Sequence, residues 1–406
     1  MTAPSLSDAA WLTDPATRAV MAALAARGGP DAARFVGGCV RNSLLDRPVD
    51  DVDIATRLEP HEVMEALKTA GLKAVPTGLD HGTVTAVSDH RPFEITTLRR
   101  DVTTDGRRAT VAFTGDWAED AGRRDFHINA LYADASGQVF DPTGQGLADI
   151  AARRVVFVGD PDRRIREDRL RILRFFRFQA WYGRGAPDPA GLAACVREAD
   201  GLSELSAERV SKELLKLLAA PDPVPTVAIM AETGILQRLL PEVPGLEAFQ
   251  ALAKVSDDAV LRLSALMPPD AGARDRAARA LRLSNRDRVR LVALAGPVPD
   301  LEQLGEAAVR AMVYADGRQA TQDRLMLALA TRPGQVERHR TLNKLVETWP
   351  VPRMPVGGRE VAAMGIPPGP ETGALLAAFE AGWIADDFPD NGHAERLQAL
   401  IDQRPG

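Results

Sequence analysis

The stretch FVGGCVRNSLLDRPVDDVDIAT, residues 35–56, combines two adjacent glycines with two closely spaced aspartates. Gly37 and Gly38 follow a strand-like run and precede a helix-like run. If DVDIAT is a strand, Asp51 and Asp53 project from the same face, because successive strand residues alternate between faces. Carboxylates held so close repel each other unless a proton or a cation lies between them. For a D-x-D pattern on its own, a solvated pair on an edge strand is the favoured interpretation, so the surrounding residues decide.

The glycines and a nearby arginine have the chemistry of a phosphate site. A junction between a strand and a helix exposes backbone N–H groups, and glycine lets a phosphate approach them. Arg41, in the first helical turn, adds a planar fork of donors that matches phosphate oxygens. A tight turn without any ligand also explains two adjacent glycines. The carboxylates nearby favour the phosphate site, because magnesium binds one or two carboxylates together with substrate phosphates.

Glu94 is a third candidate carboxylate. In RPFEITTL it alternates with Phe93 and Ile95, so it faces away from their apolar side. The alternative is an ordinary solvent-facing strand residue.

Composition limits the class of protein. The chain has 406 residues, of which 45% are hydrophobic and 26% are charged, as expected for a soluble protein of about two to four domains. The first residues do not form a signal peptide, and no apolar run is long enough to span a bilayer. Two distant cysteines and six scattered histidines disfavour a disulfide framework and a zinc site. We therefore expect a cytoplasmic protein without a membrane partner.

The charge distribution indicates one local basic region. The net charge of −6 disfavours indiscriminate binding of nucleic acid. Residues 151–180, however, contain nine arginines and only four acidic residues.

Strand signals such as ARFVGG, GTVTAV and RPFEITTL are confined to the first 140 residues, and helical periodicity dominates from about residue 144. Proline-rich breaks at 221–227, 296–300 and 349–358 divide the helical part.

Several stretches together resemble one family. GGCVRNSLLDRPVDDVDIAT is similar to the signature of class II tRNA nucleotidyltransferases, the CCA-adding enzymes, and of the related bacterial poly(A) polymerases. Further similar stretches follow in the same order: FEITTLRRDVTTDGRRATVAF, RRDFHINALY, FDPTGQGLADI, REDRLRILRFFRF and LSAERVSKELLKLL. ETGILQRLLPEV and GIPPGPETGALLAAFEAGW resemble the helical body and tail of the family. The resemblance is strongest over residues 34–218 and thinner over 245–340.

The resemblance implies an α+β fold. A nucleotidyltransferase head of the polymerase β type, with a mixed sheet, would be followed by an all-helical neck, body and tail. We expect the catalytic head at residues 1–143 and a neck that recognises the nucleotide base at 144–222. The helical body would occupy 223–350, and a helical tail that binds tRNA would occupy 351–406.

The resemblance also assigns roles to residues. Asp51 and Asp53 match the metal-binding carboxylates of the family, and Glu94 is a candidate to complete that catalytic site. Gly38, next to Gly37, matches a triphosphate contact. The other positions that match nucleotide contacts of the family are Arg41, Arg124, Asp168, Arg171, Arg174 and Arg177.

Asp168 and Arg171 also allow a reading from base chemistry. Residues three apart are neighbours on a helix surface. Cytosine and adenine each carry an amino donor beside a ring-nitrogen acceptor, which a carboxylate and a guanidinium would match. Guanine and uracil would mismatch both groups, so the pair could select C and A without a template. An intrahelical salt bridge is the alternative interpretation. Apolar neighbours predict a largely buried helix, whose arginines would need partners such as triphosphate oxygens.

Three local features refine the expectation. By composition, residues 99–113 form a polar, flexible loop, and in the family a loop at this place helps the enzyme change from adding C to adding A. Asn42 stands where the family usually has Asp, so we expect Arg41 to lack a carboxylate partner. His127 stands where Thr is common, and we interpret it as a packing change rather than a catalytic histidine.

We therefore expect an enzyme that adds CCA to the 3′ acceptor end of tRNA from CTP and ATP and releases pyrophosphate. Asp51 and Asp53 would bind two Mg²⁺ ions for an in-line displacement. A poly(A) polymerase or an enzyme that adds only A or only CC is the nearest alternative. An RNA-binding protein without activity is disfavoured by the intact carboxylates.

Overall fold

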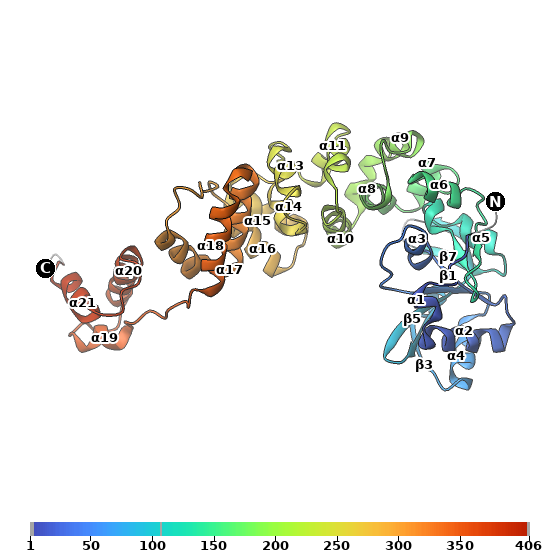
Figure 1. Ribbon diagram of the computed structural model, residues 1–406, viewed down its shortest axis with the longest axis horizontal. Coiled ribbons are helices and arrows are strands. Elements are labelled where there is room, and N and C mark those ends of the chain that lie inside the picture. The colour runs from blue at the N-terminus through green and yellow to red at the C-terminus, as the bar shows by residue number, and fades with distance from the viewer. Residues whose placement is uncertain (1–3, 106–107, 404–406) are drawn as a thin grey trace. The chain divides into compact units, whose positions relative to one another are not determined.

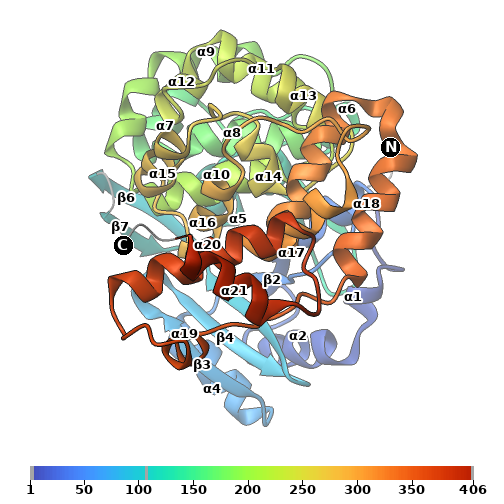
Figure 2. The same cartoon turned by 90° about the vertical axis from the view of Figure 1, so that its left-hand side faces the viewer.

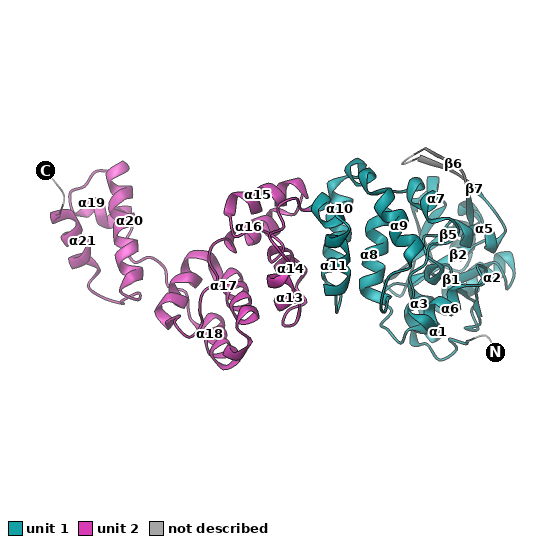
Figure 3. Cartoon of the chain, turned by 90° about the horizontal axis from the view of Figure 1, so that it is seen from above, with its two compact units in different colours: residues 1–239 teal, residues 240–406 magenta. Residues whose placement is uncertain are grey.

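The computed structural model describes residues 4–105 and 108–403, with the backbone alone for 101–105 and 108–111. The chain forms two compact units, residues 1–239 and residues 240–406 (Figure 3). The finer division at residues 143, 222 and 350 stays a prediction. None of the helices in the described ranges combines the length and the apolar character needed to cross a membrane.

A mixed sheet lies at the start of the first unit (Figure 1). Among the described residues it has seven strands in the order β3-β4-β5-β2-β1-β8-β9. Strand β2 runs parallel to β5, and the other neighbouring strands are antiparallel. The strands are β1 (Ala33–Val36), β2 (Asp53–Thr56), β3 (Lys73–Gly78), β4 (Thr83–Ser88), β5 (Arg91–Thr97), β8 (Tyr132–Ala133) and β9 (Val139–Phe140). The predicted strands ARFVGG, GTVTAV and RPFEITTL are confirmed.

The two faces of the sheet differ in polarity. Helices α2 (Pro15–Gly28) and α4 (Pro60–Thr69) pack against strands of the sheet. Phe35, Ile54 and Ile95 are at most 1% exposed, as expected for the covered face. The residues that alternate with them lie on the opposite face, which carries Asp53 and Glu94. The alternation in the sequence therefore predicted correctly that Glu94 turns away from the apolar side.

A buried carboxylate holds helix α5 (Trp117–Gly122) in the first unit. Asp120, 1% exposed, accepts hydrogen bonds from Arg123 Nη2 at 2.7 Å, Arg124 Nη2 at 3.0 Å and the Tyr132 hydroxyl at 2.7 Å. Trp117 and Tyr132 belong to the same hydrophobic cluster, with ring centroids 5.3 Å apart. Burial alone would raise the pKa of Asp120, but Arg124 and Arg123 outweigh it and lower the pKa to about 2. The network therefore fixes Arg124 beside the strands.

The segment 99–113 differs from the expected loop. It forms an antiparallel hairpin of β6 (Arg99–Asp105) and β7 (Arg108–Phe113), apart from the seven-stranded sheet (Figure 2). The prediction of a loop is wrong here because β-branched residues on both sides of the glycine favour strand pairing. Residues 106 and 107, in the middle of the predicted loop, lie outside the described part of the chain.

Helices make up the rest of the first unit. They are α6 (Gly146–Ala152), α7 (Pro161–Glu167), α8 (Leu170–Tyr182), α9 (Pro189–Arg197), α10 (Ala207–Leu218), α11 (Val224–Glu232) and α12 (Ile235–Leu239). The shorter helical elements of the unit are α1 (Ala10–Thr13), α3 (Gly38–Leu44), η1 (Leu79–His81), η2 (His127–Asn129) and η3 (Ala199–Glu204). Helix α8 packs against α10.

Aromatic rings attach α8 to the segment that follows Arg124. Phe126 lies 4.9 Å from Phe157 and 5.1 Å from Phe178 between ring centroids. Phe157 stacks on Phe175 at 5.4 Å. All four side chains are at most 4% exposed. This cluster therefore connects α8 to the segment that follows Arg124 through a buried apolar contact.

Among its described residues, the second unit contains helices and connecting segments but no strand. Its helices are α13 (Glu247–Ala253), α14 (Ala259–Ser264), α15 (Ala271–Ala280), α16 (Asn285–Ala293), α17 (Glu306–Thr331), η4 (Pro333–Gln335), α18 (Val336–Thr348), α19 (Gly358–Ala363), α20 (Pro370–Ala385) and α21 (His393–Asp402). Helix α17 is interrupted at Gly317, whose φ of 81° is left-handed. The predicted proline-rich break at 296–300 lies between helices, and so does the break at 349–358 up to Gly357, since Gly358 begins α19. The break predicted at 221–227 is only partly correct: α11 begins at Val224, because proline in the first turn of a helix interrupts no intrahelical hydrogen bond.

Replacing Asp120 with Asn should reduce the free energy of unfolding at pH 7 by about 3–5 kcal/mol, because two partly buried guanidinium groups lose the buried carboxylate that pairs with them. The low native pKa of Asp120 stabilises the fold above about pH 4, and this contribution disappears as the pH falls toward 2. The variant should therefore lose less stability than the wild type over that interval. Urea unfolding at pH 7 and at pH 3 measures both effects.

Glu337→Gln is the matched control, because its ion pair with Arg340 is largely exposed on both sides. This change should alter stability by at most about 0.5 kcal/mol. An Asp120→Asn variant as stable as the wild type at pH 7 would show that the buried network does not stabilise the fold.

Candidate active site

Two glycines connect β1 to α3 at the centre of the sheet. Gly37 has φ 69° and ψ −116°, a conformation that favours glycine. A Cβ atom at Gly37 would lie 3.8 Å from Nη1 of Arg124, and one at Gly38 would lie 3.9 Å from Nη2 of Arg41. The structure therefore brings both predicted arginines to the predicted glycine junction.

The carboxylates lie on the neighbouring strands. Strand β2 begins at Asp53, so Asp51 precedes the strand and the prediction of a strand that includes Asp51 is wrong by two residues. The parallel pairing of β2 with β5 places Asp53 opposite Glu94. Burial raises the pKa of Asp53 to about 6, and repulsion from Glu94 and then from Asp51 adds to this effect. Glu94 and Asp51 therefore both act on the Asp53 carboxylate, although only Asp53 and Glu94 are on strands.

The Asp53 carboxylate also interacts with two positively charged side chains. Arg124 and Arg41 lower the pKa of Asp53, against the larger effects of burial and of the other carboxylates. Arg124 donates from Nε to the Tyr132 hydroxyl at 3.1 Å, and its Nη2 pairs with Asp120. Glycine backbone, carboxylates and guanidinium groups, which were predicted from separate stretches of sequence, thus lie at one place.

The donor set fits a hard divalent cation. Across the described ranges, no three acidic, histidine or cysteine residues are arranged to hold an ion as they stand. Magnesium, however, needs only one or two protein carboxylates. The raised pKa of Asp53 shows that negative charge here lacks compensation, which a bound cation would supply.

Arg41 is almost buried, with 7% of its surface exposed. Its hydrogen bonds within the described residues go to neutral oxygens of Asn42, Asn129 and Tyr182. The expectation that Arg41 lacks a carboxylate partner, because Asn42 replaces an acid, agrees with this arrangement. Burial lowers the pKa of Arg41.

Asp168 and Arg171 do not form the helix-surface pair that their spacing predicts. Asp168 has φ −153° and ψ 107°, so it lies in an extended break between α7 and α8. One of its oxygens accepts from the backbone N–H of Leu170 at 3.1 Å, and the other from Arg209 Nη2 at 2.8 Å. An Asp side chain that accepts a backbone hydrogen bond competes with the helix, which explains the break.

Arg171 has a different carboxylate partner. Its Nη1 donates to Glu167 at 2.7 Å and to the carbonyl of Arg164 at 2.8 Å. Its Nη2 donates to the carbonyl of Arg123 at 3.2 Å. The alternative interpretation of Asp168 and Arg171 as an intrahelical salt bridge is therefore wrong, but Arg171 does contact the segment that carries Arg124.

The other two arginines of α8 also have protein partners. Arg174 Nε donates to Asp125 at 2.7 Å, and Arg177 Nε donates to Glu213 at 2.5 Å. Both carboxylates are buried. The expectation that the arginines of this buried helix need partners is met within the protein by Asp125 and by Glu213 of α10, so triphosphate oxygens are not required for this purpose.

Sequence reasoning missed the residues that connect α8 to the glycine junction. Asp125 accepts from Arg174 and also from Asn129 Nδ2 at 2.9 Å, and Asn129 in turn accepts from Arg41. Asp125 and Asn129 both lie in RRDFHINALY, so that stretch contained a signal for them. Tyr182 and Arg209 had no local signal, because their partners lie far away in the sequence. His127 hydrogen-bonds to Asp149 at 2.8 Å, which agrees with a packing role.

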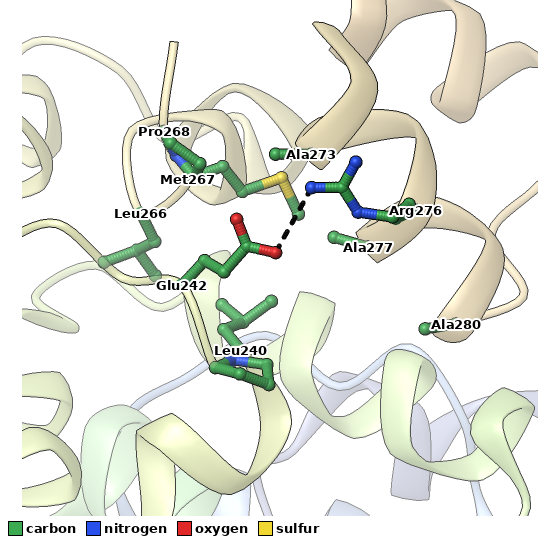
Figure 4. Close-up of a pocket in the computed structure, with 10 residues that line it drawn as sticks. Leu240, Glu242, Leu266, Met267, Pro268, Ala273, Arg276, Ala277 and Ala280 are labelled. Carbon is green, nitrogen blue, oxygen red and sulfur yellow. Dashed lines mark hydrogen bonds and ion pairs between the residues drawn. The ribbon is translucent and has the colours of Figure 1, made fainter. Parts of the chain in front are cut away.

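A pocket of about 250 Å³ lies in the second unit (Figure 4). It is lined mainly by apolar side chains, including Leu240, Leu266 and Met267, and Glu242 pairs with Arg276 at 3.5 Å beside it. None of the predicted site residues lines this pocket. It is therefore separate from the candidate active site.

Asp53→Asn should stabilise the protein in the presence of a chelator at pH 7.5, because it removes a carboxylate that burial, Glu94 and Asp51 all disfavour. The rise of the Asp53 pKa from 3.8 to about 6 corresponds to a gain of about 3 kcal/mol. The advantage should shrink as the pH falls from about 6 to 4, where Asp53 itself becomes protonated. Thermal unfolding of both proteins in chelator, at pH 7.5 and at about pH 4, measures the effect.

Asp50→Asn is the matched control, because Asp50 is exposed and adjacent in sequence. It should leave the melting temperature unchanged. A destabilised Asp53→Asn variant in chelator would contradict the inferred repulsion among the three carboxylates.

Comparison with known proteins identifies the same regions. Residues 33–156 match the family model described as Poly A polymerase head domain. Residues 186–246 match a model described as a probable RNA and SrmB-binding site of polymerase A. A CCA tRNA nucleotidyltransferase 1, mitochondrial, from Mus musculus is 33% identical over 360 residues, covering 86% of this chain and 82% of that protein.

Two bacterial proteins extend the similarity. A CCA-adding enzyme from Levilactobacillus brevis is 32% identical over 371 residues, covering 88% of this chain and 91% of that protein. A crystal structure of the Bacillus stearothermophilus CCA-adding enzyme in complex with CTP is similar with a TM-score of 0.75 and 28% identity. It covers 96% of this chain and 98% of that chain. Together with the glycine junction and its carboxylates, these similarities show that the chain belongs to the family of CCA-adding tRNA nucleotidyltransferases.

Proposed function

We propose that the protein adds CCA to the 3′ end of tRNA, using CTP and ATP and releasing pyrophosphate. The observation that carries this proposal is the meeting of Asp53 and Glu94 with Arg41 and Arg124 at the Gly37–Gly38 junction. Relatives named for this activity span more than four-fifths of the chain. The similar Bacillus stearothermophilus enzyme was solved with CTP.

Each part of the site has a task in the reaction. The terminal ribose hydroxyl of the tRNA attacks the α-phosphorus, and the bond from that phosphorus to the oxygen of the β-phosphate breaks. Arg41, Arg124 and the N–H groups at the glycine junction would hold the triphosphate. Asp51 and Asp53 would bind Mg²⁺, with Glu94 beside them. When bound, Mg²⁺ makes the attacking hydroxyl more acidic and neutralises charge on the leaving pyrophosphate.

Asp168 and Arg171 would select the base even though they do not pair with each other. Each oxygen of Asp168 accepts one recorded hydrogen bond, and a carboxylate oxygen has a second lone pair for an amino group of C or A. The recorded bonds of Arg171 come from Nη1 and Nη2, so its Nε–H can donate to a ring nitrogen. Their protein partners would hold both groups in position before the nucleotide arrives.

Arg174 and Arg177 would add contacts to the nucleotide from further along α8. Their recorded ion pairs use Nε and Nη2 of Arg174 and Nε of Arg177, which leaves other N–H groups of each fork for a phosphate. A poly(A) polymerase shares the head model, and it would add A without C. The nucleotides that the protein adds therefore decide between these two activities.

The test is incubation of the protein with tRNA transcripts that end in -N, -NC or -NCC, with each nucleotide separately and with Mg²⁺. The wild type should add C, C and A in that order. Asp51→Ala and Asp53→Ala should each reduce addition at least about 100-fold while tRNA binding is retained. Asp50→Ala should behave as the wild type. Addition of A alone to every transcript would favour a poly(A) polymerase, and activity retained in Asp53→Ala would remove this residue from the metal site.

Asp168→Ala and Arg171→Ala should relax selection against UTP and GTP. Each change removes one matched hydrogen bond to the base, which costs about 1–3 kcal/mol, or about tenfold or more in selectivity. Each variant is given each of the four nucleotides on tRNA ending in -NC and on tRNA ending in -NCC. The measurement is the ratio of C or A incorporation to U or G incorporation. Arg166→Ala changes an exposed arginine of the preceding helix and should leave the ratio unchanged. If both variants slow all four nucleotides by the same factor, Asp168 and Arg171 are structural residues.

A further inference from the structure

Arg41 is bound in the protein by neutral groups only, as far as the described residues show. Asn42 Oδ1 accepts from Nε at 3.1 Å and from Nη2 at 2.9 Å. Asn129 Oδ1 accepts from Nη1 at 2.5 Å, and the Tyr182 hydroxyl accepts from Nη2 at 2.8 Å. These four bonds use four of the five N–H groups of the guanidinium, so its orientation is determined while one N–H of Nη1 remains.

The aromatic rings of α8 cover the guanidinium. The Arg41 Cζ lies 4.2 Å from the ring centroid of Tyr182 and 5.2 Å from that of Phe178. Rings over a guanidinium attract it without cancelling its charge. Tyr182 therefore contacts Arg41 in two ways, through the face of its ring and through its hydroxyl.

The contrast with the neighbouring arginines shows what this arrangement preserves. Arg124 and Arg174 each pair with a buried carboxylate, which compensates their charge within the protein. Burial lowers the pKa of Arg41, against the opposite effects of Tyr182 and Asp125. None of its hydrogen bonds within the described residues goes to a carboxylate, so the guanidinium can still pair directly with an anion. Since Arg41 lies at the glycine junction, the nearest anion in the proposed reaction is the triphosphate.

We infer that Tyr182 is a positioning residue for Arg41, whose hydroxyl aims the guanidinium at the triphosphate without neutralising it. The inference rests on the proposed function and adds a residue that is 141 positions from Arg41 in the sequence. Tyr182 ends α8, the helix that also carries Arg171 and Arg174. The helix that contacts the base would thus also hold the phosphate-binding arginine.

Tyr182→Phe tests this role, because it removes the hydroxyl and keeps the ring over Arg41. The dissociation constants of CTP and ATP, measured by calorimetry with Mg²⁺ and without tRNA, should both rise about 3–10-fold. The ratio between the two nucleotides should stay the same, since a phosphate contact carries no information about the base. In the addition assay, KM for both nucleotides should rise by the same factor, and kcat should change less than KM.

A double-mutant cycle separates positioning from a general packing effect. Lysine lacks the planar fork of arginine, so Arg41→Lys should make a further Tyr182→Phe change nearly silent. Trp181→Phe is the matched control: Trp181 is the adjacent aromatic residue, and its Nε1 donates to the carbonyl of Lys216 at 2.7 Å rather than to Arg41. It should leave both dissociation constants unchanged. Thermal unfolding of each variant checks that the fold is retained.

Two results would overturn the inference. One is a Tyr182→Phe variant that binds CTP and ATP within twofold of the wild type. The other is a full loss of affinity that persists in the Arg41→Lys background. A wild-type protein that adds no nucleotide to tRNA, but whose CTP affinity falls on Tyr182→Phe, would instead overturn the proposed function and leave the role of Tyr182 intact.

Discussion

Asp53 and Glu94 lie side by side because β2 runs parallel to β5 in a register that pairs these two residues. A shift of one residue would turn one of them to the face that α2 and α4 cover, where a charge without a partner is costly. The antiparallel pairing of β1 with β2, in which Phe35 lies opposite Ile54, also brings Asp53 to the end of β1, from which Gly37 and Gly38 lead into α3. The carboxylate and phosphate halves of the site therefore depend on one set of strand pairings.

The arginines around this centre are held in two different ways. Arg124, Arg174 and Arg177 each pair with a buried carboxylate, and the last two pairs connect α8 to Asp125, in the segment after α5, and to Glu213 of α10. Together with the ring cluster of Phe126 and Phe157, they fix α8 against the segment that follows Arg124. Arg41 has hydrogen bonds and rings but neutral partners. The compensated arginines hold the scaffold together in addition to their proposed nucleotide contacts, whereas Arg41 has no carboxylate among its described hydrogen-bond partners.

The site carries unfavourable charge of both signs in the free protein. The pKa of Asp53 is raised to about 6 and that of Arg41 is lowered, and burial is the first cause of both shifts. A magnesium–nucleotide complex would relieve both, because it brings a cation to the carboxylates and an anion to the guanidinium. The charges that lower the stability of the free protein would thus strengthen binding of the magnesium–nucleotide complex, as is common at functional sites.

The sequence by itself determined the features that depend on neighbours along the chain. These include the glycine junction, the outward face of Glu94, the paired aspartates and the change from strands to proline-divided helices. Only the tertiary structure decided which partners the charged groups have. Arg41 contacts Asn129 and Tyr182, which are 88 and 141 positions away, and Asp168 contacts Arg209 rather than Arg171. Periodicity reports which face of a segment is buried, whereas an ion pair depends on how separate segments pack, so the break at Asp168 and the partners of α8 appear only in the folded chain.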